Sequence, residues 1–149
     1  MYALTLSLHN LLRWVVLIAA VFAVMRAISG WLGRTAWTPA SAGPGRILTI
    51  SLDIQFLIGI LLYAVLSPVT KAAFADMGAA MRESQVRFFV AEHLVIMVLA
   101  LVVAHIGKVL APKAATDALR YRRAFIWYGL TTLLILAGMP WWRPMFRLG

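Results

Sequence analysis

The chain has 149 residues, of which 63% are hydrophobic and 13% are charged. Ordinary soluble domains contain about 45–50% apolar and about 25% charged residues, so we expect one domain embedded in a lipid bilayer. The formal net charge is +9, but the basic residues border apolar stretches, which favours lipid headgroups over nucleic acid as their partner. Cysteine is absent, which excludes disulfides, thiolate metal sites and covalent C-x-x-C-H haem attachment.

Four apolar stretches are long enough to cross a membrane, which takes about 20 residues in helical form. In chain order they cover residues 4–29, 47–67, 88–108 and 124–142. Backbone polar groups cannot stay unpaired in hydrocarbon, so each stretch should be a helix. Proline and glycine residues mark the breaks between them. The sequence therefore predicts an all-α integral membrane protein, an up-down-up-down bundle of four transmembrane helices in a single domain, 1–149.

The segment between the second and third stretches, 69–87, is not uniformly polar. Its apolar side chains recur at helical spacing with Asp76, Arg82 and Glu83 between them. This pattern predicts a short amphipathic helix lying in the headgroup region. At the end of the fourth stretch, Trp141 and Trp142 are typical of a membrane interface.

The distribution of Lys and Arg predicts an orientation. Eight of the 14 Lys and Arg residues lie near the two connections that follow the first and third stretches. Five, including Arg147, lie on the side of the N-terminus, and Arg13 lies within the first stretch. The excess should face the cytoplasm. We therefore expect a multi-pass protein of the inner (plasma) membrane with both termini in the periplasm.

Two histidines should lie at the same depth in this bundle. His9 is about five residues inside the first stretch and His93 about five inside the third, and both are counted from the same side of the membrane. In an up-down-up-down bundle these two helices are diagonal partners. Two imidazoles facing each other across a bundle can bind the iron of a haem from both sides.

Several neighbouring residues suit a macrocycle near these histidines. Small side chains could leave room for it, Phe88 and Phe89 could wall it, and Arg13 or Arg87 could pair with haem propionates. Arg13 is on the same helix face as His9, and Glu92 could pair with either arginine. The small residues are Gly59, Thr131, Thr132 and Gly138. An alternative is that both histidines have only structural, hydrogen-bonding roles.

A second polar group lies toward the predicted cytoplasmic side. There Asp53 of the second stretch should approach Arg26 or His105, either of which would neutralise its carboxylate. The simplest interpretation is a polar contact between adjacent helices. The functional alternative is a proton entry point or a quinone site, because a His and a carboxylate together can relay protons.

Four segments of the sequence carry a resemblance to a known family: LHNLLRW at 8–14, IQFLIGILLY at 54–63, RFFVAEH at 87–93 and AGMPW at 137–141. Together they resemble small bacterial four-span membrane proteins often labelled cytochrome b-like. The resemblance covers nearly the whole chain. It implies haem b as the cofactor and makes His9 and His93 the candidate ligands.

The leading hypothesis is a membrane electron carrier with a bis-His haem b, which exchanges electrons with a quinone or a membrane redox complex and is not a stand-alone enzyme. One alternative is an accessory subunit, without enzymatic activity, of a larger respiratory or photosynthetic complex. A third hypothesis, a proton conduit through Asp53 and His105, ranks last because the centre of every span is aliphatic.

Overall fold

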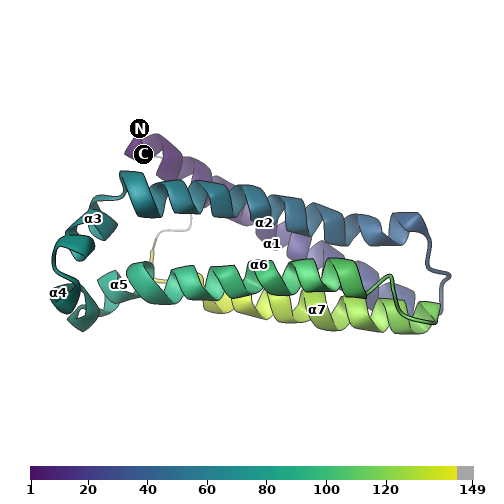
Figure 1. Ribbon diagram of the computed structural model, residues 1–149. Helices are drawn as coiled ribbons and strands as arrows, with labels where there is room; N and C mark the ends of the chain where they lie inside the picture. The colour runs from purple at the N-terminus through teal and green to yellow at the C-terminus, as the bar shows by residue number, and fades with distance from the viewer. Residues whose placement is uncertain (144–149) are drawn as a thin grey trace.

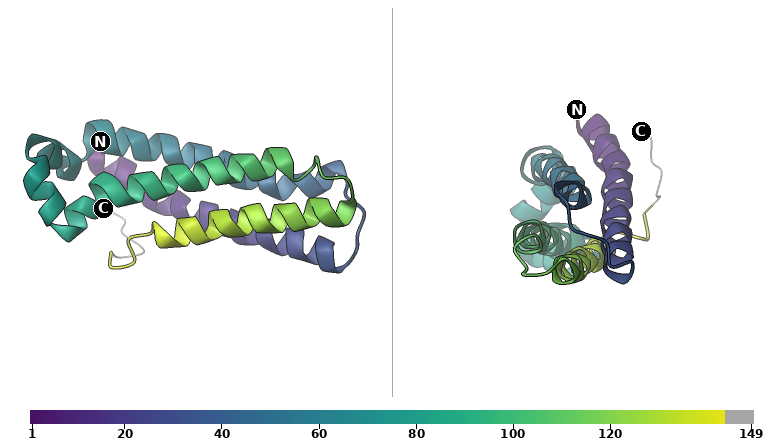
Figure 2. Two further views of the ribbon diagram at one scale, coloured as in Figure 1. Left: turned by 60° about the horizontal axis from the view of Figure 1, so that its bottom comes forward. Right: turned by 90° about the vertical axis from the view of Figure 1, so that its right-hand side faces the viewer.

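The computed structural model describes residues 1–143, and within this range the chain forms helices and turns without a strand. Four long helices run side by side as a bundle (Figures 1 and 2): α1 (Tyr2–Leu32), α2 (Gly43–Leu61), α6 (His93–Leu110) and α7 (Asp117–Ala137). The main contacts of α1 are with α2 and α7, and α6 packs against the same two helices. Helices α1 and α6 therefore face each other across the bundle. Arg147 lies outside the described residues.

Three helical segments are long and apolar enough to cross a membrane: Tyr2–Leu32, Pro39–Leu66 and Ser84–Leu110. Many of their large apolar side chains point away from the bundle. Ile18 is 67% exposed and Leu57 is 68% exposed. Exposed apolar surface costs roughly 25 cal/mol per Å² in water, and lipid removes that cost. These are the features of a membrane protein.

The second and third of these segments each contain a π-helical turn. The π-helix η2 (Leu62–Leu66) continues α2, and η3 (Phe88–Glu92) joins the short helix α5 (Ser84–Arg87) to α6. Before α2, the 3-10 helix η1 (Pro39–Ala42) ends the connection from α1. Turns of the π type occur often at functional sites, and both of these lie at the end of the bundle that holds the chain's N-terminus (Figure 1).

The fourth predicted span, 124–142, differs from the helix in the structure. Helix α7 begins earlier, at Asp117, because the Thr116 side chain accepts a hydrogen bond from the Leu119 amide at 3.3 Å. It ends at Ala137, where Gly138 and Pro140 follow. Trp141 and Trp142 therefore lie beyond the helix, contrary to the prediction. Only residues 124–137 of the predicted span are helical.

The prediction of one amphipathic helix at 69–87 was also wrong. The segment forms three short helices: α3 (Pro68–Ala75), α4 (Met77–Arg82) and α5. Asp76 accepts a hydrogen bond from the Ala79 amide at 2.9 Å, and Glu83 accepts one from the Val86 amide at 2.6 Å. Each carboxylate thus caps the start of a new helix and breaks the one before it.

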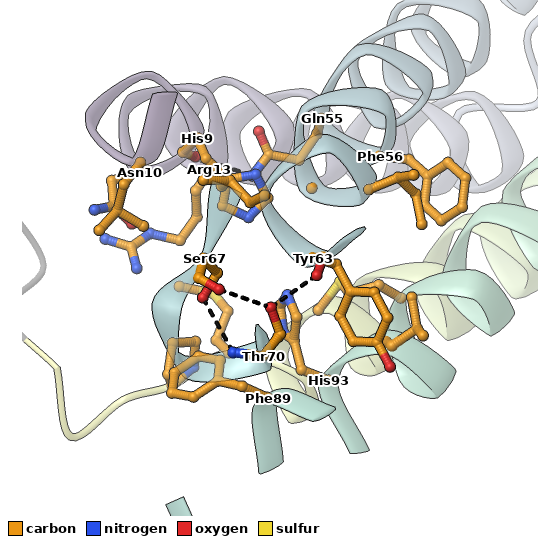
Figure 3. A pocket seen from close by; sticks show the side chains of 18 of the residues that line it. His9, Asn10, Arg13, Gln55, Phe56, Tyr63, Ser67, Thr70, Phe89 and His93 are labelled. Atoms are coloured by element: carbon orange, nitrogen blue, oxygen red, sulfur yellow. Dashed lines mark hydrogen bonds between the residues drawn. The ribbon is translucent and has the colours of Figure 1, made fainter. Parts of the chain in front are cut away.

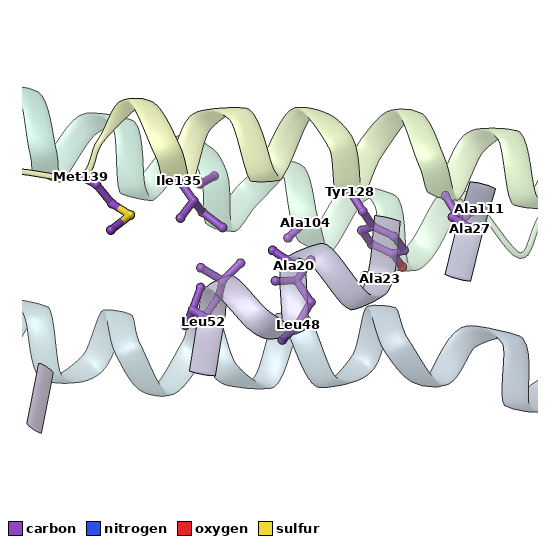
Figure 4. Packing of buried hydrophobic residues seen from close by; sticks show 14 residues of the cluster. Ala20, Ala23, Ala27, Leu48, Leu52, Ala104, Ala111, Tyr128, Ile135 and Met139 are labelled. Atoms are coloured by element: carbon purple, nitrogen blue, oxygen red, sulfur yellow. The ribbon is translucent and has the colours of Figure 1, made fainter. Parts of the chain in front are cut away.

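The bundle core consists mainly of small side chains (Figure 4). Ala20, Ala100 and Ala104 are fully buried. At Gly107 of α6, an added Cβ would lie 2.6 Å from the Cβ of Trp127 in α7. Small residues let helix backbones approach closely, which is the usual packing between helices in a membrane.

Candidate functional site

A cavity of about 190 Å³ lies at the end of the bundle near the N-terminus. It is lined by residues of α1, α2, η2, α3, η3, α6 and α7 and by the chain just after α7. Its polar and charged lining comes chiefly from His9, Arg13, Gln55, Thr70, His93 and Arg143. The remaining lining is apolar, with Leu52, Met97, Leu101 and Met139 toward the core. The cavity thus has a largely apolar lining that includes two histidines and two arginines.

The structure brings His9 and His93 together in this cavity (Figure 3). The centres of the two imidazole rings lie 6.4 Å apart, and the ring planes are inclined at 73°. The rings come from α1 and α6, which face each other across the bundle, and point toward one another (Figure 3). Their matched depth is what the sequence spacing predicts.

His93 is held by a hydrogen bond to the end of α7. Its Nδ1 atom lies 2.7 Å from the carbonyl oxygen of Gly138. A carbonyl only accepts, so Nδ1 must carry the proton and donate it. In the neutral ring Nε2 is then unprotonated, which is the form that binds a metal. Metal-binding histidines are typically oriented in this way by a backbone carbonyl.

His9 is positioned by helix α2. The side-chain amide of Gln55 donates a hydrogen bond from Nε2 to the backbone carbonyl of His9 at 2.9 Å. One turn further along α2, an added Cβ at Gly59 would lie 3.2 Å from Cε1 of His9. Gly59 was expected to leave space for a macrocycle, but the space that it leaves is taken by the His9 ring. Among the described residues, the buried Nδ1 of His9 has no hydrogen-bond partner.

Aromatic rings surround His93 on the side of the π-helix η3. The ring centres of Phe88 and Phe89 lie 5.8 Å and 6.2 Å from that of His93. Phe89 lines the cavity, while Phe88 is buried and packs against Trp142 at 4.6 Å. Of the two predicted wall residues, only Phe89 lines the cavity, and Phe88 packs behind it against a tryptophan from beyond α7.

Two arginines line the cavity, Arg13 and Arg143. Arg13 is buried on α1, and the guanidinium of Arg143 lies 4.4 Å from the centre of the Phe89 ring. Arg87, the other cation predicted to act here, does not line the cavity. Instead it forms an ion pair with Glu92 at 2.8 Å on the outside of the bundle. Sequence reasoning missed Arg143 because it follows the end of α7, where helical spacing gives no guide.

Hydrogen bonds tie the elements around the cavity together. The hydroxyl of Tyr63 donates to the carbonyl of Val90 at 2.9 Å, and Thr70 donates to the carbonyl of Tyr63 at 2.7 Å. These bonds join η2, α3 and η3. By contrast, Thr131 and Thr132 do not line the cavity, although they were predicted to leave space for a macrocycle. Their hydroxyls donate to carbonyls of their own helix.

The second polar group forms a His–carboxylate pair. Nε2 of His105 on α6 lies 2.9 Å from Oδ1 of Asp53 on α2, and both side chains are partly exposed. Of the two predicted partners of Asp53, the structure selects His105. Arg26 is exposed and forms no ion pair within residues 1–143. The pair is separate from the His9–His93 cavity.

The donor set at the cavity limits its chemistry. Two imidazoles can supply two ligands to one metal, and within residues 1–143 no group of three or more His, Cys, Asp or Glu side chains is suitably placed. The arginines can bind anionic groups, and the apolar lining can hold a flat hydrophobic body. Comparisons with models of protein families, with curated proteins and with solved structures found no match to this chain.

Proposed function

We propose that this chain is a membrane-embedded b-type haem protein that transfers electrons, with His9 and His93 as the two axial ligands. The observation that carries the proposal is the separation of the two imidazoles. When two imidazoles bind one metal along a common axis, metal–nitrogen bonds of about 2.0 Å and the size of the rings put the ring centres about 6.3 Å apart. The separation here is 6.4 Å.

The lining of the cavity supports the same ligand. Haem b has a flat apolar body and two propionates on one edge, and the cavity offers a largely apolar lining that includes Arg13 and Arg143. Its volume of about 190 Å³ is below the roughly 300–1,000 Å³ of ordinary ligand pockets. Only part of a haem would therefore be enclosed by the cavity as it stands. The resemblance of four sequence segments to cytochrome b-like proteins points to the same cofactor.

Each residue has a distinct part in this proposal. A bound haem iron supplies one-electron chemistry. His9 and His93 would hold the metal, and two histidine ligands would favour electron transfer over chemistry on a bound substrate. The arginines hold the propionates. Leu52, Met97 and the neighbouring apolar side chains exclude water. A quinone or a membrane redox complex is the partner in electron exchange that this location favours.

We further propose that α7 is a fourth membrane span. Residues 124–137 are about 21 Å long as a helix, which is short of the roughly 30 Å hydrocarbon core. However, α7 packs along α1 and α6, and Ile126, Leu130 and Leu133 form an exposed apolar stripe on its outer side. Arg122 and Arg123 at its start can extend to the headgroups. Helix α7 therefore completes an up-down-up-down bundle of four spans.

The orientation proposed from the sequence places the α1–α2 and α6–α7 connections in the cytoplasm. The haem cavity, the three short helices α3 to α5 and the N-terminus then lie toward the periplasm of a bacterial inner membrane. In that arrangement the cavity is closest to periplasmic redox partners. The short helices α3 to α5 would rest in the outer headgroup layer.

Purification in detergent from cells supplied with haem tests this function. We expect a red protein with about one haem per chain and, after reduction, a sharp Soret band with resolved α and β bands. His9→Ala and His93→Ala should each change this spectrum. His105→Ala is the matched control, because His105 lies outside the cavity, and it should retain the wild-type spectrum.

The accessory-subunit alternative predicts a different result. Under it, the well-folded wild-type protein is colourless, binds no added haem and co-purifies with a larger complex. His9→Ala and His93→Ala would then affect only folding or assembly. A colourless, folded protein would therefore overturn the haem proposal and leave the helical membrane fold untouched.

A further inference from the structure

The two histidines at the cavity are not held in the same way. His93 donates from Nδ1 to the carbonyl of Gly138 at 2.7 Å. His9 has no such bond: its Nδ1 is buried and lacks a hydrogen-bond partner within the described chain. The bond that Gln55 makes at this position goes to the backbone carbonyl of His9 and not to Nδ1 of its ring.

The acceptor of His93 is fixed firmly in the bundle. Gly138 ends α7, and its own amide donates to the carbonyl of Leu134 at 2.9 Å. Its α-carbon packs so tightly on α6 that an added Cβ would lie 2.9 Å from Cγ2 of Ile96. The carbonyl oxygen therefore cannot move away from His93 without moving the end of α7.

This difference has a predictable effect on metal binding. A hydrogen bond from the outer nitrogen orients an imidazole and makes its other nitrogen a better donor, and losing such a partner typically costs roughly 10–100-fold in metal affinity. His93 has this support and His9 lacks it. The bond from a metal to His9 should therefore be the weaker of the two.

Resting on the proposed function, we propose that His9 is an exchangeable ligand and that the site admits a small neutral diatomic molecule, of the carbon monoxide class, on the His9 side of the ferrous haem. If haem is held as proposed, the bond from its ferrous iron to His9 would break as a bond from the iron to the diatomic molecule forms. The His9 ring would stay neutral, and no electron or proton would be transferred.

The surroundings of His9 suit this exchange. Val16 on its own helix and Leu52 and Phe56 on α2 line the same cavity beside the polar Asn10, Arg13 and Gln55, and the three apolar side chains can pack against a small, weakly polar molecule. His93 stays bonded to Gly138 throughout and keeps the iron attached to α6.

Carbon monoxide binding and haem retention test this proposal in the wild type, His9→Ala, His93→Ala and the control His105→Ala. Each protein is used as the full chain in detergent with haem. We expect ferrous wild type to bind carbon monoxide at a rate that reaches a plateau at high gas concentration, because loss of His9 becomes limiting. His9→Ala should bind it without a plateau, and His93→Ala should retain haem roughly 10–100-fold more weakly than His9→Ala.

A ferrous wild-type spectrum that carbon monoxide leaves unchanged, while His9→Ala binds the gas, would overturn the exchange but not the haem site. Weaker haem retention in His9→Ala than in His93→Ala would overturn the assigned asymmetry. Nitrogen-15 NMR of histidine in the protein prepared without haem gives a readout that needs no cofactor. We expect His93 to hold its proton on Nδ1 and His9 to populate both tautomers, whereas equal tautomer populations would contradict the inference.

Discussion

The backbone of Gly59 forms the wall against which the His9 ring rests, because a methyl group at Gly59 would lie only 3.2 Å from Cε1 of His9. A larger side chain at this point of α2 must push the imidazole away from His93. The alignment of the two rings across the cavity therefore depends on a residue that itself offers no ligand.

Substitution of Gly59 tests this dependence. We expect Gly59→Leu to displace His9 and to remove the six-coordinate haem spectrum, because the leucine side chain needs the space of the ring. Gly129→Leu is the matched control, since an added Cβ at Gly129 of α7 would meet nothing within 4 Å. Haem per polypeptide, measured from the pyridine haemochrome, compares the two variants. Equal haem content in both would show that the close contact at Gly59 is unimportant.

Removal of the cation at Arg143 should weaken haem binding. A hydrogen bond to a charged group contributes about 1.5–3 kcal/mol, so Arg143→Gln should reduce haem affinity by roughly 10–100-fold. Arg87→Gln is the control, because Arg87 pairs with Glu92 outside the cavity. Transfer of haem to an acceptor protein such as apomyoglobin gives the relative loss rates. If Arg87→Gln had the larger effect, the propionates would have to lie toward α5.

The Asp53–His105 pair should stabilise the packing of α2 on α6 without affecting the haem. Hydrogen bonds between helices in a membrane contribute about 0.5–2 kcal/mol. A double-mutant cycle with Asp53→Asn and His105→Ala, followed by unfolding in denaturing detergent, should give a coupling energy in this range. The absorption spectrum of each variant should stay unchanged. A coupling of zero would leave the pair without a structural role.

The absence of cysteine allows a direct test of topology. Single substitutions Ala115→Cys and Ser84→Cys place a thiol at exposed positions at opposite ends of the bundle. In intact bacterial cells, a membrane-impermeant maleimide should label Ser84→Cys and should label Ala115→Cys only after lysis. The reverse pattern would invert the orientation, and labelling of both in intact cells would show that the segment between these positions does not cross the membrane.

The parts of this fold that follow from helical periodicity could be predicted from the sequence. His9 and His93 lie at equal distances from the ends of two apolar stretches, so a diagonal arrangement of the two helices was enough to predict their matched depth, although the π-helical turn η3 before His93 was not predicted. The same counting placed Asp53 near either Arg26 or His105, and the structure pairs it with His105. Both predictions concern residues within long helices, where position along the chain fixes depth.

Other parts depended on local events that the apolar pattern does not record. The capping carboxylates Asp76 and Glu83 divided one predicted helix into three. Gly138 ended α7 before Trp141, so Arg143 reached the cavity from a turn. The role of Gly59 also differed from the prediction. The His9 imidazole fills the space beside Gly59 because α1 and α2 lie close together, and the sequence alone does not give that distance.

The most direct test of the central claim is the electron paramagnetic resonance spectrum of the oxidised protein at low temperature, because it reports the number, type and relative orientation of the axial ligands. Two imidazoles whose planes are inclined at 73° predict a low-spin ferric signal of strong anisotropy, which is absent in His93→Ala and present in His105→Ala. A wild-type protein that is fully loaded with haem but gives a high-spin signal, or a folded protein that takes up no haem, would contradict the claim.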